Sequence, residues 1–558
     1  MIVEKDVEIV LTDGSCLYAN VFRPDDGKHP VLMCMGIYGK DIHFEDGYPF
    51  PWKILMAEHP EVATEKTSGK WLRWEMPDPE RWVPAGYTIV MVDARGSGKS
   101  PGYLDPFSST ETRDYYNAIE WAGVQNWSTG KVGLLGISYL AITQWQVAGL
   151  RPPHLAAICP WEGGSDIYRD WSHQGGILSY QFPFEWLPRQ VYPNQHGNAE
   201  TSHIDRDTNN RTTGLAVLSE DQLRGNRADH VGDLLNHPLD DEWYRERSPR
   251  LDRIEVPVLS AGNWGGLGLH LRGNIEGFKR AGSEKKWLFI HGGRHYESFY
   301  LTPYIEVQRQ FFDRFLKNEH NGWETRKPVQ LEIRRPGGIE HREEARWPLE
   351  RTKWTPYYLN CEEGSLGTEA PTHDTSVTYD AFGDGVHFMT KPFTREIEFT
   401  GPIGCRLFVS SPTVDMDVFL TVRLFDTAGA EVVITGASED VPVTRGWLRA
   451  SHRTLDPVRS VPAQPFHSHD ETKPLVPDEV YGLDIEVWPT SMVIPKGFKI
   501  GLTVQGRDFE FPLKPGRMLH NSSVDRPPEV FGGGKSLYSG PSRTSYLTMP
   551  VIPASSSE

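Results

Sequence analysis

The stretch KVGLLGISYLAITQ, residues 131–144, decides the fold. An apolar run of strand type leads up to Ser138, and apolar spacing of helical type follows it. A sharp turn between strand and helix, with the small residues Gly136 and Ala141 beside it, is typical of a nucleophile elbow, which lifts a serine hydroxyl above a sheet. Leu140 departs from the plain G-x-S-x-G pattern, and a structural serine at a helix N-cap would have the same flanks. We predict that Ser138 is a nucleophile.

The chain on both sides of this turn alternates between short apolar strands and helices. Strands are expected at residues 29–36, 87–98, 154–161, 256–263 and 286–293, after a hairpin at residues 7–24. The segments between them, such as TRDYYNAIEWAGVQ at 112–125, have helical spacing. Buried strands joined by helices predict a mostly parallel sheet with helices on both faces, an α/β fold.

Two further regions differ from this pattern. Residues 166–250 are rich in Asn, Gln, His and Trp with short helical fragments, and we predict an inserted helical cap. From residue 327, strand-like runs follow one another, beginning with VQLEIRR at 329–335, which predicts an all-β sandwich of jelly-roll type over residues 327–558. Residues 1–165 and 251–326 then form the α/β-hydrolase domain. A division into domains is expected because single cores stop growing near ~250–300 residues.

Several separated motifs resemble one family in the same order. GISYLAITQWQ (136–146) is preceded by VDARGSGKSPG (92–102) and followed by SDIYRDW (165–171). DMDVFLTVRLFD (415–426) and GWLRASHR (446–453) extend the resemblance over nearly the whole chain. The chain resembles the superfamily of cocaine esterase, α-amino-acid ester hydrolases and X-prolyl dipeptidyl aminopeptidases. That resemblance implies a catalytic α/β-hydrolase, a helical cap and a jelly roll.

The general base should follow the last strand of the sheet, because the chain order in this fold is nucleophile, acid, base. The segment KWLFIHGGRHYESF offers His291 and His295, and the resemblance favours His295, with His291 a packed residue at the strand end. One oxyanion donor should be the backbone N–H of Tyr139, the residue after the nucleophile. The resemblance implies that the second donor is the hydroxyl of Tyr38.

The triad acid departs from the family pattern. Relatives carry an aspartate shortly after the strand that follows the cap, where this chain has Gly265 and Gly266. We predict that Glu162 replaces it, because it ends the neighbouring apolar strand, where a charged side chain needs a partner such as the His295 imidazole. Asp166 is the alternative, and a dyad without an acid remains open.

Composition limits the partners. The formal net charge of −17, from 58 basic and 75 acidic residues, would repel nucleic acid and anionic lipid. No stretch approaches the ~20 apolar residues of a membrane span, and the first residues read as a strand and not as a signal peptide. The five cysteines are expected as buried free thiols, which fits the cytoplasm. We expect no cofactor and no metal, and the sequence leaves homo-oligomer formation open.

Three functions are compatible with these observations. The first is a serine hydrolase that cleaves a small carboxylic ester, with an amide also possible, through an acyl-serine. The second is an X-prolyl or α-amino-acyl peptidase or ester hydrolase with the same chemistry, which would need carboxylates for the substrate ammonium. The third is a catalytically idle carbohydrate-binding protein, which the missing aspartate would favour.

Overall fold

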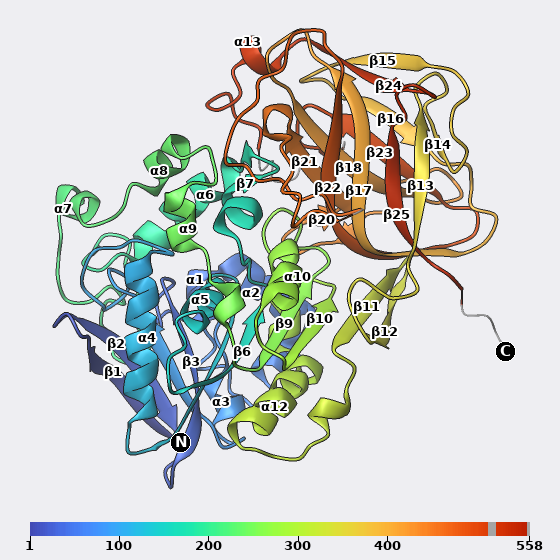
Figure 1. Ribbon diagram of the computed structural model, residues 1–558. Helices are drawn as coiled ribbons and strands as arrows, with labels where there is room; N and C mark the ends of the chain where they lie inside the picture. Colours follow the sequence, from blue (N-terminus) through green and yellow to red (C-terminus); the bar gives the residue numbers. More distant parts are fainter. Residues whose placement is uncertain (462, 512–519, 555–558) are drawn as a thin grey trace.

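The computed structural model describes residues 1–461, 463–511 and 520–554 as two lobes built on two large sheets (Figure 1). Within those residues, ten strands form the sheet of the N-terminal lobe and eleven that of the C-terminal lobe. In Figure 1 the C-terminal lobe, in orange and red, lies above the N-terminal one, and the strands β11 and β12 lie near their junction. No helix among the described residues is both long enough and apolar enough to span a bilayer.

The sheet of the N-terminal lobe has the order β1-β2-β4-β3-β5-β6-β9-β10-β11-β12. Its strands are β1 Ile2–Val10, β2 Cys16–Arg23, β3 His29–Gly36, β4 Thr88–Asp93, β5 Ser128–Ile137, β6 Leu155–Trp161, β9 Val258–Asn263, β10 Lys286–His291, β11 Val329–Arg335 and β12 Gly338–Glu344. Pairing is parallel from β4 to β11, and the outer strands at either end run antiparallel. The predicted mostly parallel sheet and the N-terminal hairpin are therefore confirmed.

Helices cover both faces of this sheet, because apolar side chains of β5 point to both faces and need to be buried on each. The long helices are α4 Ser109–Gly123, α5 Tyr139–Ala148, α10 Leu271–Arg280 and α12 Thr302–Leu316. Val132 and Leu134 pack in one core with side chains of α4 and α5, whereas Leu135 and Ile137 pack in another with phenylalanines of α12. Successive strand residues point to opposite faces, so one strand supplies both cores. Short helices complete the lobe: α1 Phe44–Gly47, α2 Pro49–Glu58, α3 Pro79–Trp82 and α11 Glu297–Tyr300.

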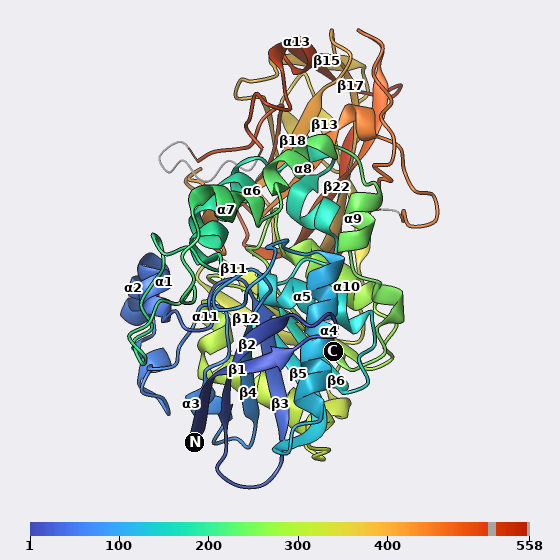
Figure 2. The ribbon, with the colours of Figure 1, turned by 90° about the vertical axis from the view of Figure 1, so that its left-hand side faces the viewer.

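The segment predicted as a helical cap contains four short helices and a small hairpin. These are α6 Gln181–Trp186, α7 Glu220–Gly225, α8 His230–Asn236, α9 Glu242–Arg247, β7 His173–Gln174 and β8 Ile177–Leu178. In Figure 2 the helices α6 to α9 lie between the sheet of the N-terminal lobe and the C-terminal lobe. The Arg169 guanidinium fixes this position by donating to the backbone oxygens of His467 and Ser468.

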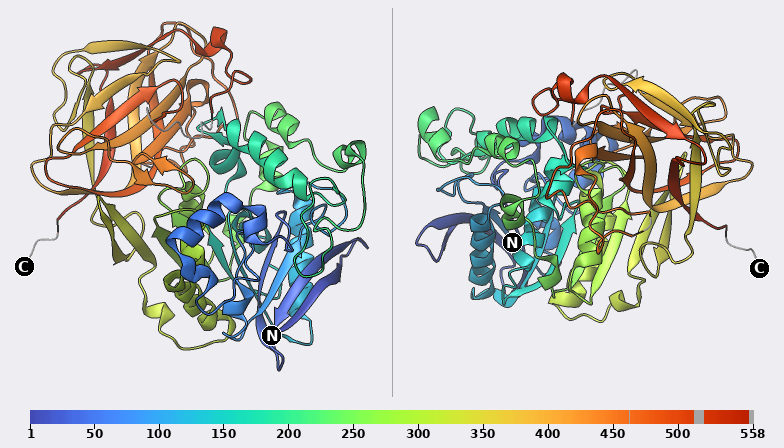
Figure 3. Two further views of the ribbon diagram at one scale, coloured as in Figure 1. Left: turned by 180° about the vertical axis from the view of Figure 1, so that it is seen from behind. Right: turned by 45° about the horizontal axis from the view of Figure 1, so that its top comes forward.

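The C-terminal lobe is all-β apart from short helical turns and contains a closed barrel (Figure 3). Its strands are β13 Lys353–Asn360, β14 Ser365–Gly367, β15 Thr375–Asp380, β16 Val386–Met389, β17 Ile397–Ser410, β18 Asp417–Phe425, β21 Thr444–Arg449, β22 Tyr481–Ile494, β23 Lys499–Gln505, β24 Gly534–Ser539 and β25 Tyr546–Ile552, with helix α13 at Pro528–Phe531. The barrel closes because β25 pairs with both β13 and β17. A separate hairpin, β19 Ile434–Thr435 and β20 Asp440–Val441, projects from this lobe.

One strand was expected in the wrong sheet. Residues 329–335, predicted to open the all-β domain, form β11 and pair in parallel with β10 of the N-terminal sheet, for example Val329 opposite Leu288. The apolar alternation of Val329, Leu331 and Ile333 would suit either sheet. Only its packing against Leu288 and Ile290 places it in the hydrolase lobe.

Candidate active site

Ser138 lies at a sharp turn between strand β5 and helix α5. Its backbone has φ 57° and ψ −114°, a left-handed conformation that costs a non-glycine residue energy and is typically retained at functional sites. Its N–H donates to the backbone oxygen of Trp161 over 3.0 Å, which ties the turn to the end of β6. The side chain lines a cavity of about 150 Å³. The predicted strand-turn-helix geometry is therefore present.

Glu162 directly follows β6 and lies against His295. Its side chain is 0% exposed, and its Oε2 accepts a hydrogen bond from His295 Nδ1 over 2.8 Å. Its Oε1 accepts a weaker one from Asn263 Nδ2 over 3.3 Å. The contact predicted between Glu162 and His295 is thus observed, although the two residues are far apart in the chain.

His295 does not contact Ser138 through its other nitrogen, contrary to the expectation from the sequence. Its Nε2 lies instead 3.0 Å from Oε1 of Glu75, a residue that the sequence analysis missed. Glu75 is 2% exposed, has a positive φ of 63°, and accepts at its backbone oxygen from the N–H of Ile137, next to the nucleophile. Glu75 lies in a stretch rich in aromatic residues, 41–80, and nothing in that sequence pattern indicated a role for this carboxylate.

The two carboxylates control the charge of His295. Burial alone would lower the pKa of His295, but the attraction of Glu162 and Glu75 outweighs it and raises the pKa to about 10. Burial raises the pKa of Glu75 to about 7 even though His295 opposes this. One proton is therefore shared between His295 Nε2 and Glu75 Oε1, two groups whose pKa values are both raised.

A second histidine occupies the position expected for His295. His270 Nε2 lies 3.1 Å from Ser138 Oγ, and the ring of His270 stacks on that of His295 with centroids 5.4 Å apart. His270 is 2% exposed and immediately precedes helix α10. The sequence analysis also missed this residue. The only available signal was its place a few residues beyond Gly266, in the segment where relatives carry their acid.

The glycines that replace the family aspartate make room for the C-terminal lobe. A Cβ on Gly265 would lie 2.5 Å from Cα of Gly436, in the β19–β20 hairpin, so no larger side chain fits without displacing it. The same hairpin accepts a hydrogen bond from the N–H of His295 at the oxygen of Ala437, over 2.9 Å. A Cβ on Gly266 would lie 3.2 Å from the backbone oxygen of Asn263 and 3.7 Å from Cβ of His270, so it meets no atom of the C-terminal lobe at close range. Packing therefore excludes an aspartate at Gly265, but not at Gly266.

Both predicted oxyanion donors border the nucleophile. Tyr38 lines the same cavity as Ser138, and its hydroxyl accepts from Trp186 Nε1 of the cap over 3.0 Å, which leaves its own proton free to donate. The Tyr139 side chain points away and donates to Glu111 over 2.6 Å. Only its backbone N–H, in the first turn of α5, remains for an oxyanion, since these groups have no partner within a helix.

The remaining sequence candidates have structural partners. Asp166, the alternative acid, bonds to the guanidinium of Arg169 over 3.0 Å and lies at the start of the cap. Burial raises its pKa, but Arg169 more than compensates and lowers it to about 2. His291 is buried and contacts Ser298 over 3.2 Å. Neither residue reaches the nucleophile through a hydrogen bond among the described residues.

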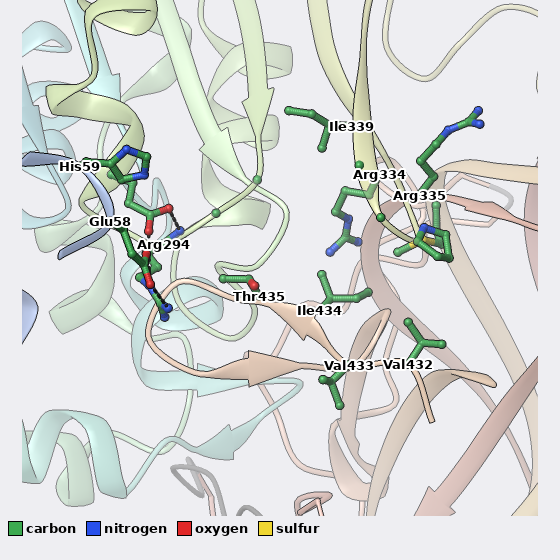
Figure 4. Close-up of a pocket in the computed structure, with 17 residues that line it drawn as sticks. Glu58, His59, Arg294, Arg334, Arg335, Ile339, Val432, Val433, Ile434 and Thr435 are labelled. Carbon is green, nitrogen blue, oxygen red and sulfur yellow. Dashed lines mark hydrogen bonds and ion pairs between the residues drawn. The ribbon is translucent and has the colours of Figure 1, made fainter. Parts of the chain in front are cut away.

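A larger cavity of about 610 Å³ lies beside this site and not in it (Figure 4). Arg294, next to His295 in sequence, forms an ion pair there with Glu58 over 3.1 Å. Glu58, His59 and Glu297 could bring three ligand atoms within 4.8 Å of one another, but the ion pair already engages Glu58. Ser138 does not line this cavity, so its size does not make it the reaction site.

The serine lies at a sharp turn after the central parallel strand β5, and a histidine paired with a carboxylate follows strand β10. This arrangement defines an α/β-hydrolase. The sequence pattern described as X-Pro dipeptidyl-peptidase (S15 family) matches residues 13–297. That of the X-Pro dipeptidyl-peptidase C-terminal non-catalytic domain matches residues 321–548. The chain belongs to the X-Pro dipeptidyl-peptidase (S15) family and is a hydrolase of ester or peptide bonds.

Two esterases and one solved hydrolase structure match nearly the whole chain. It is 26% identical to cocaine esterase of Rhodococcus sp. (strain MB1 Bresler), over 99% of this chain and 98% of that protein. It is 25% identical to a putative serine esterase of Mycobacterium bovis, over 93% of this chain and 94% of that protein. The crystal structure of a CocE/NonD family hydrolase from Staphylococcus aureus superposes with a TM-score of 0.86 and 35% identity, over 99% and 94% of the two chains. The family resemblance seen in the sequence is confirmed.

Proposed function

We propose that the protein cleaves small carboxylic esters through an acyl enzyme on Ser138, with His295 and Glu162 as its acid-base pair. The observation that carries this proposal is the hydrogen-bonded pair of Glu162 and His295 beside a strained serine, all just beyond the carboxyl ends of the parallel strands β5, β6 and β10. Tyr38 and the Tyr139 N–H are the proposed oxyanion donors. The proposed triad is thus Ser138, His295 and Glu162. His295 can be the base for Ser138 only once its Nε2 is free of Glu75.

The cavity supports an acyl group about the size of one aromatic ring. Its volume of about 150 Å³ equals that of a protein cavity known to accept benzene. Its walls include Tyr38, Trp74, Phe182, Trp186, Leu267 and Val441. These side chains offer apolar contact to a ring or a short chain, so we expect esters of small acids to be better substrates than esters of long fatty acids. Cleavage of an X-prolyl or amino-acyl peptide is the second candidate, supported by the family match.

Labelling and turnover test the proposal directly. A fluorophosphonate should label Ser138 alone, and Ser138→Ala should abolish hydrolysis of p-nitrophenyl acetate without loss of thermal stability. His295→Ala should also abolish turnover, because the groups of a triad act as a unit and their losses do not add. A label on another serine would contradict the assignment of Ser138.

Three finer expectations accompany the proposal. We expect the barrel of the C-terminal lobe to be of the jelly-roll type, which its antiparallel pairing supports. We expect the protein to act in the cytoplasm, which the five cysteines support because each is a free thiol. Its expected partner is a small ester or peptide, and association into homo-oligomers is left to measurement.

A further inference from the structure

Two imidazole rings lie beside the nucleophile, and their partners differ. His270 Nε2 lies 3.1 Å from Ser138 Oγ. His295, stacked on it at 18° between the ring planes, has a carboxylate at each nitrogen, Glu162 at Nδ1 and Glu75 at Nε2. The rings are not equivalent, so proton transfer has to be assigned to each one separately.

Neither nitrogen of His295 is available to Ser138 in this arrangement. Nδ1 donates to Glu162 over 2.8 Å, and Nε2 shares a hydrogen bond with Glu75 over 3.0 Å, whichever of the two groups carries the proton. To act as the base, Nε2 would have to leave Glu75 and turn to Ser138. That movement would leave the buried side chain of Glu75 without its hydrogen-bond partner, which is unfavourable.

His270 has the opposite environment. Among the described residues its Nδ1 has no hydrogen-bond partner, so no carboxylate stabilises a positive charge on this ring. Burial, reinforced by the nearby His295, holds the pKa of His270 well below its usual range. The ring is therefore neutral at pH 7, and a neutral imidazole has one nitrogen that can accept a proton.

We propose that His270 is a further catalytic residue, which takes the proton of Ser138 during acylation, while His295 between its carboxylates acts as the acid. The proposal rests on the proposed function, in which Ser138 becomes acylated. Ser138 Oγ bonds to the carbonyl carbon, its proton passes to His270 Nε2, and the C=O pair moves onto the oxyanion. As the bond to the alcohol oxygen breaks, that oxygen receives the proton that His295 shares with Glu75.

Deacylation reverses the two roles. Water attacks the acyl carbon and gives a proton to His295, which is now short of one. His270 returns its proton to Ser138 Oγ as the acyl bond breaks, and both rings regain their starting states. Two titratable groups whose environments push their pKa values apart are the pattern expected of an acid and a base that share one site.

Pre-steady-state hydrolysis of p-nitrophenyl acetate separates the two histidines. p-Nitrophenolate leaves without being protonated, so acylation of this ester needs a base but no acid. His295 then releases its proton to solvent, which balances the departing anion, before it accepts a proton from water. We expect His270→Asn to slow the burst of p-nitrophenolate by ~10²–10⁴-fold, the usual contribution of a general base. His295→Asn should keep the burst and lose steady-state turnover, and mass spectrometry should find the acetyl group on Ser138.

The reverse pattern, a burst in His270→Asn and none in His295→Asn, overturns the proposal and returns the base role to His295. Loss of the burst in both variants, or in neither, also overturns it. Thermal unfolding verifies that each variant is folded, and His270→Gln with His295→Gln replace any that is not. His230→Asn, an equally buried histidine outside the cavity, should keep both phases. Absence of fluorophosphonate label on Ser138 in the wild type would instead refute the proposed function.

Discussion

Replacing Glu162 by glutamine removes the negative charge that faces His295 and keeps the shape of the side chain at position 162. The lost interaction is a hydrogen bond of 2.8 Å between the fully buried Glu162 carboxylate and the His295 ring. Such bonds contribute about 1.5–3 kcal/mol, which corresponds to roughly 10- to 150-fold in rate. In other catalytic triads, loss of the acid lowers kcat by up to ~10⁴-fold. We therefore expect kcat to fall by ~10–10⁴-fold, with Glu75 continuing to stabilise positive charge on His295.

The assay is steady-state hydrolysis of p-nitrophenyl acetate, with circular dichroism to verify the fold. Asp166→Asn is the matched control, since Asp166 was the alternative acid and bonds to Arg169 instead. It should lower the melting temperature and leave kcat within a few-fold. If Glu162→Gln keeps nearly all of its kcat, or if Asp166→Asn loses as much, Glu162 is not the acid.

Three further predictions concern other parts of the site. Tyr38→Phe should lower kcat by ~10²–10³-fold, or ~2.7–4 kcal/mol, with little change in KM, and an unchanged kcat would make Tyr38 only a packing residue. Gly265→Ala should lower both kcat/KM and the melting temperature, because its Cβ would lie 2.5 Å from Cα of Gly436, and unchanged values would mean that the hairpin moves freely. Burial lowers the pKa of His452 to about 4 and of His467 to about 3. Since the unfolded chain binds these protons first, the free energy of unfolding should fall as pH drops below ~6.5, by up to ~1.4 kcal/mol per pH unit for each histidine. Chemical denaturation at several pH values measures this, and His452→Asn should flatten the slope.

The sequence predicted those features that depend on local pattern or on strand order. The elbow at Ser138 follows from the change of apolar spacing on its two sides. Glu162 could be predicted because its strand was expected to lie next to the one with Gly265, and strand ends that are neighbours in a parallel sheet lie close in space. The predicted contact between Glu162 and His295 also depended on the family resemblance, which favoured His295 and showed that the usual aspartate is missing.

The sequence could not predict Glu75 and His270. Both lie in loops, whose positions in space do not follow from the order of the strands. Glu75 reaches His295 from a loop of irregular structure, and only its positive φ and its bond to the N–H of Ile137 set its direction. His270 lies 132 residues from Ser138 in the chain, in a segment whose pattern indicated only a turn before a helix. Its Nδ1 is buried without a hydrogen-bond partner because of how the chain packs in three dimensions. The spacing of residues in the sequence does not indicate this.

The hairpin of β19 and β20 connects the two lobes at the point where the reaction is expected. Ala437 accepts from the N–H of His295, and Ser438, Glu439 and Val441 line the same cavity as Ser138. A domain described in its family as non-catalytic thus supplies one wall of the cavity. Changes in the length or sequence of this hairpin could alter the choice of acyl group while leaving every residue of the hydrolase lobe untouched. Substrate preference in this chain could therefore diverge through a surface loop more than 100 residues beyond the last proposed catalytic residue.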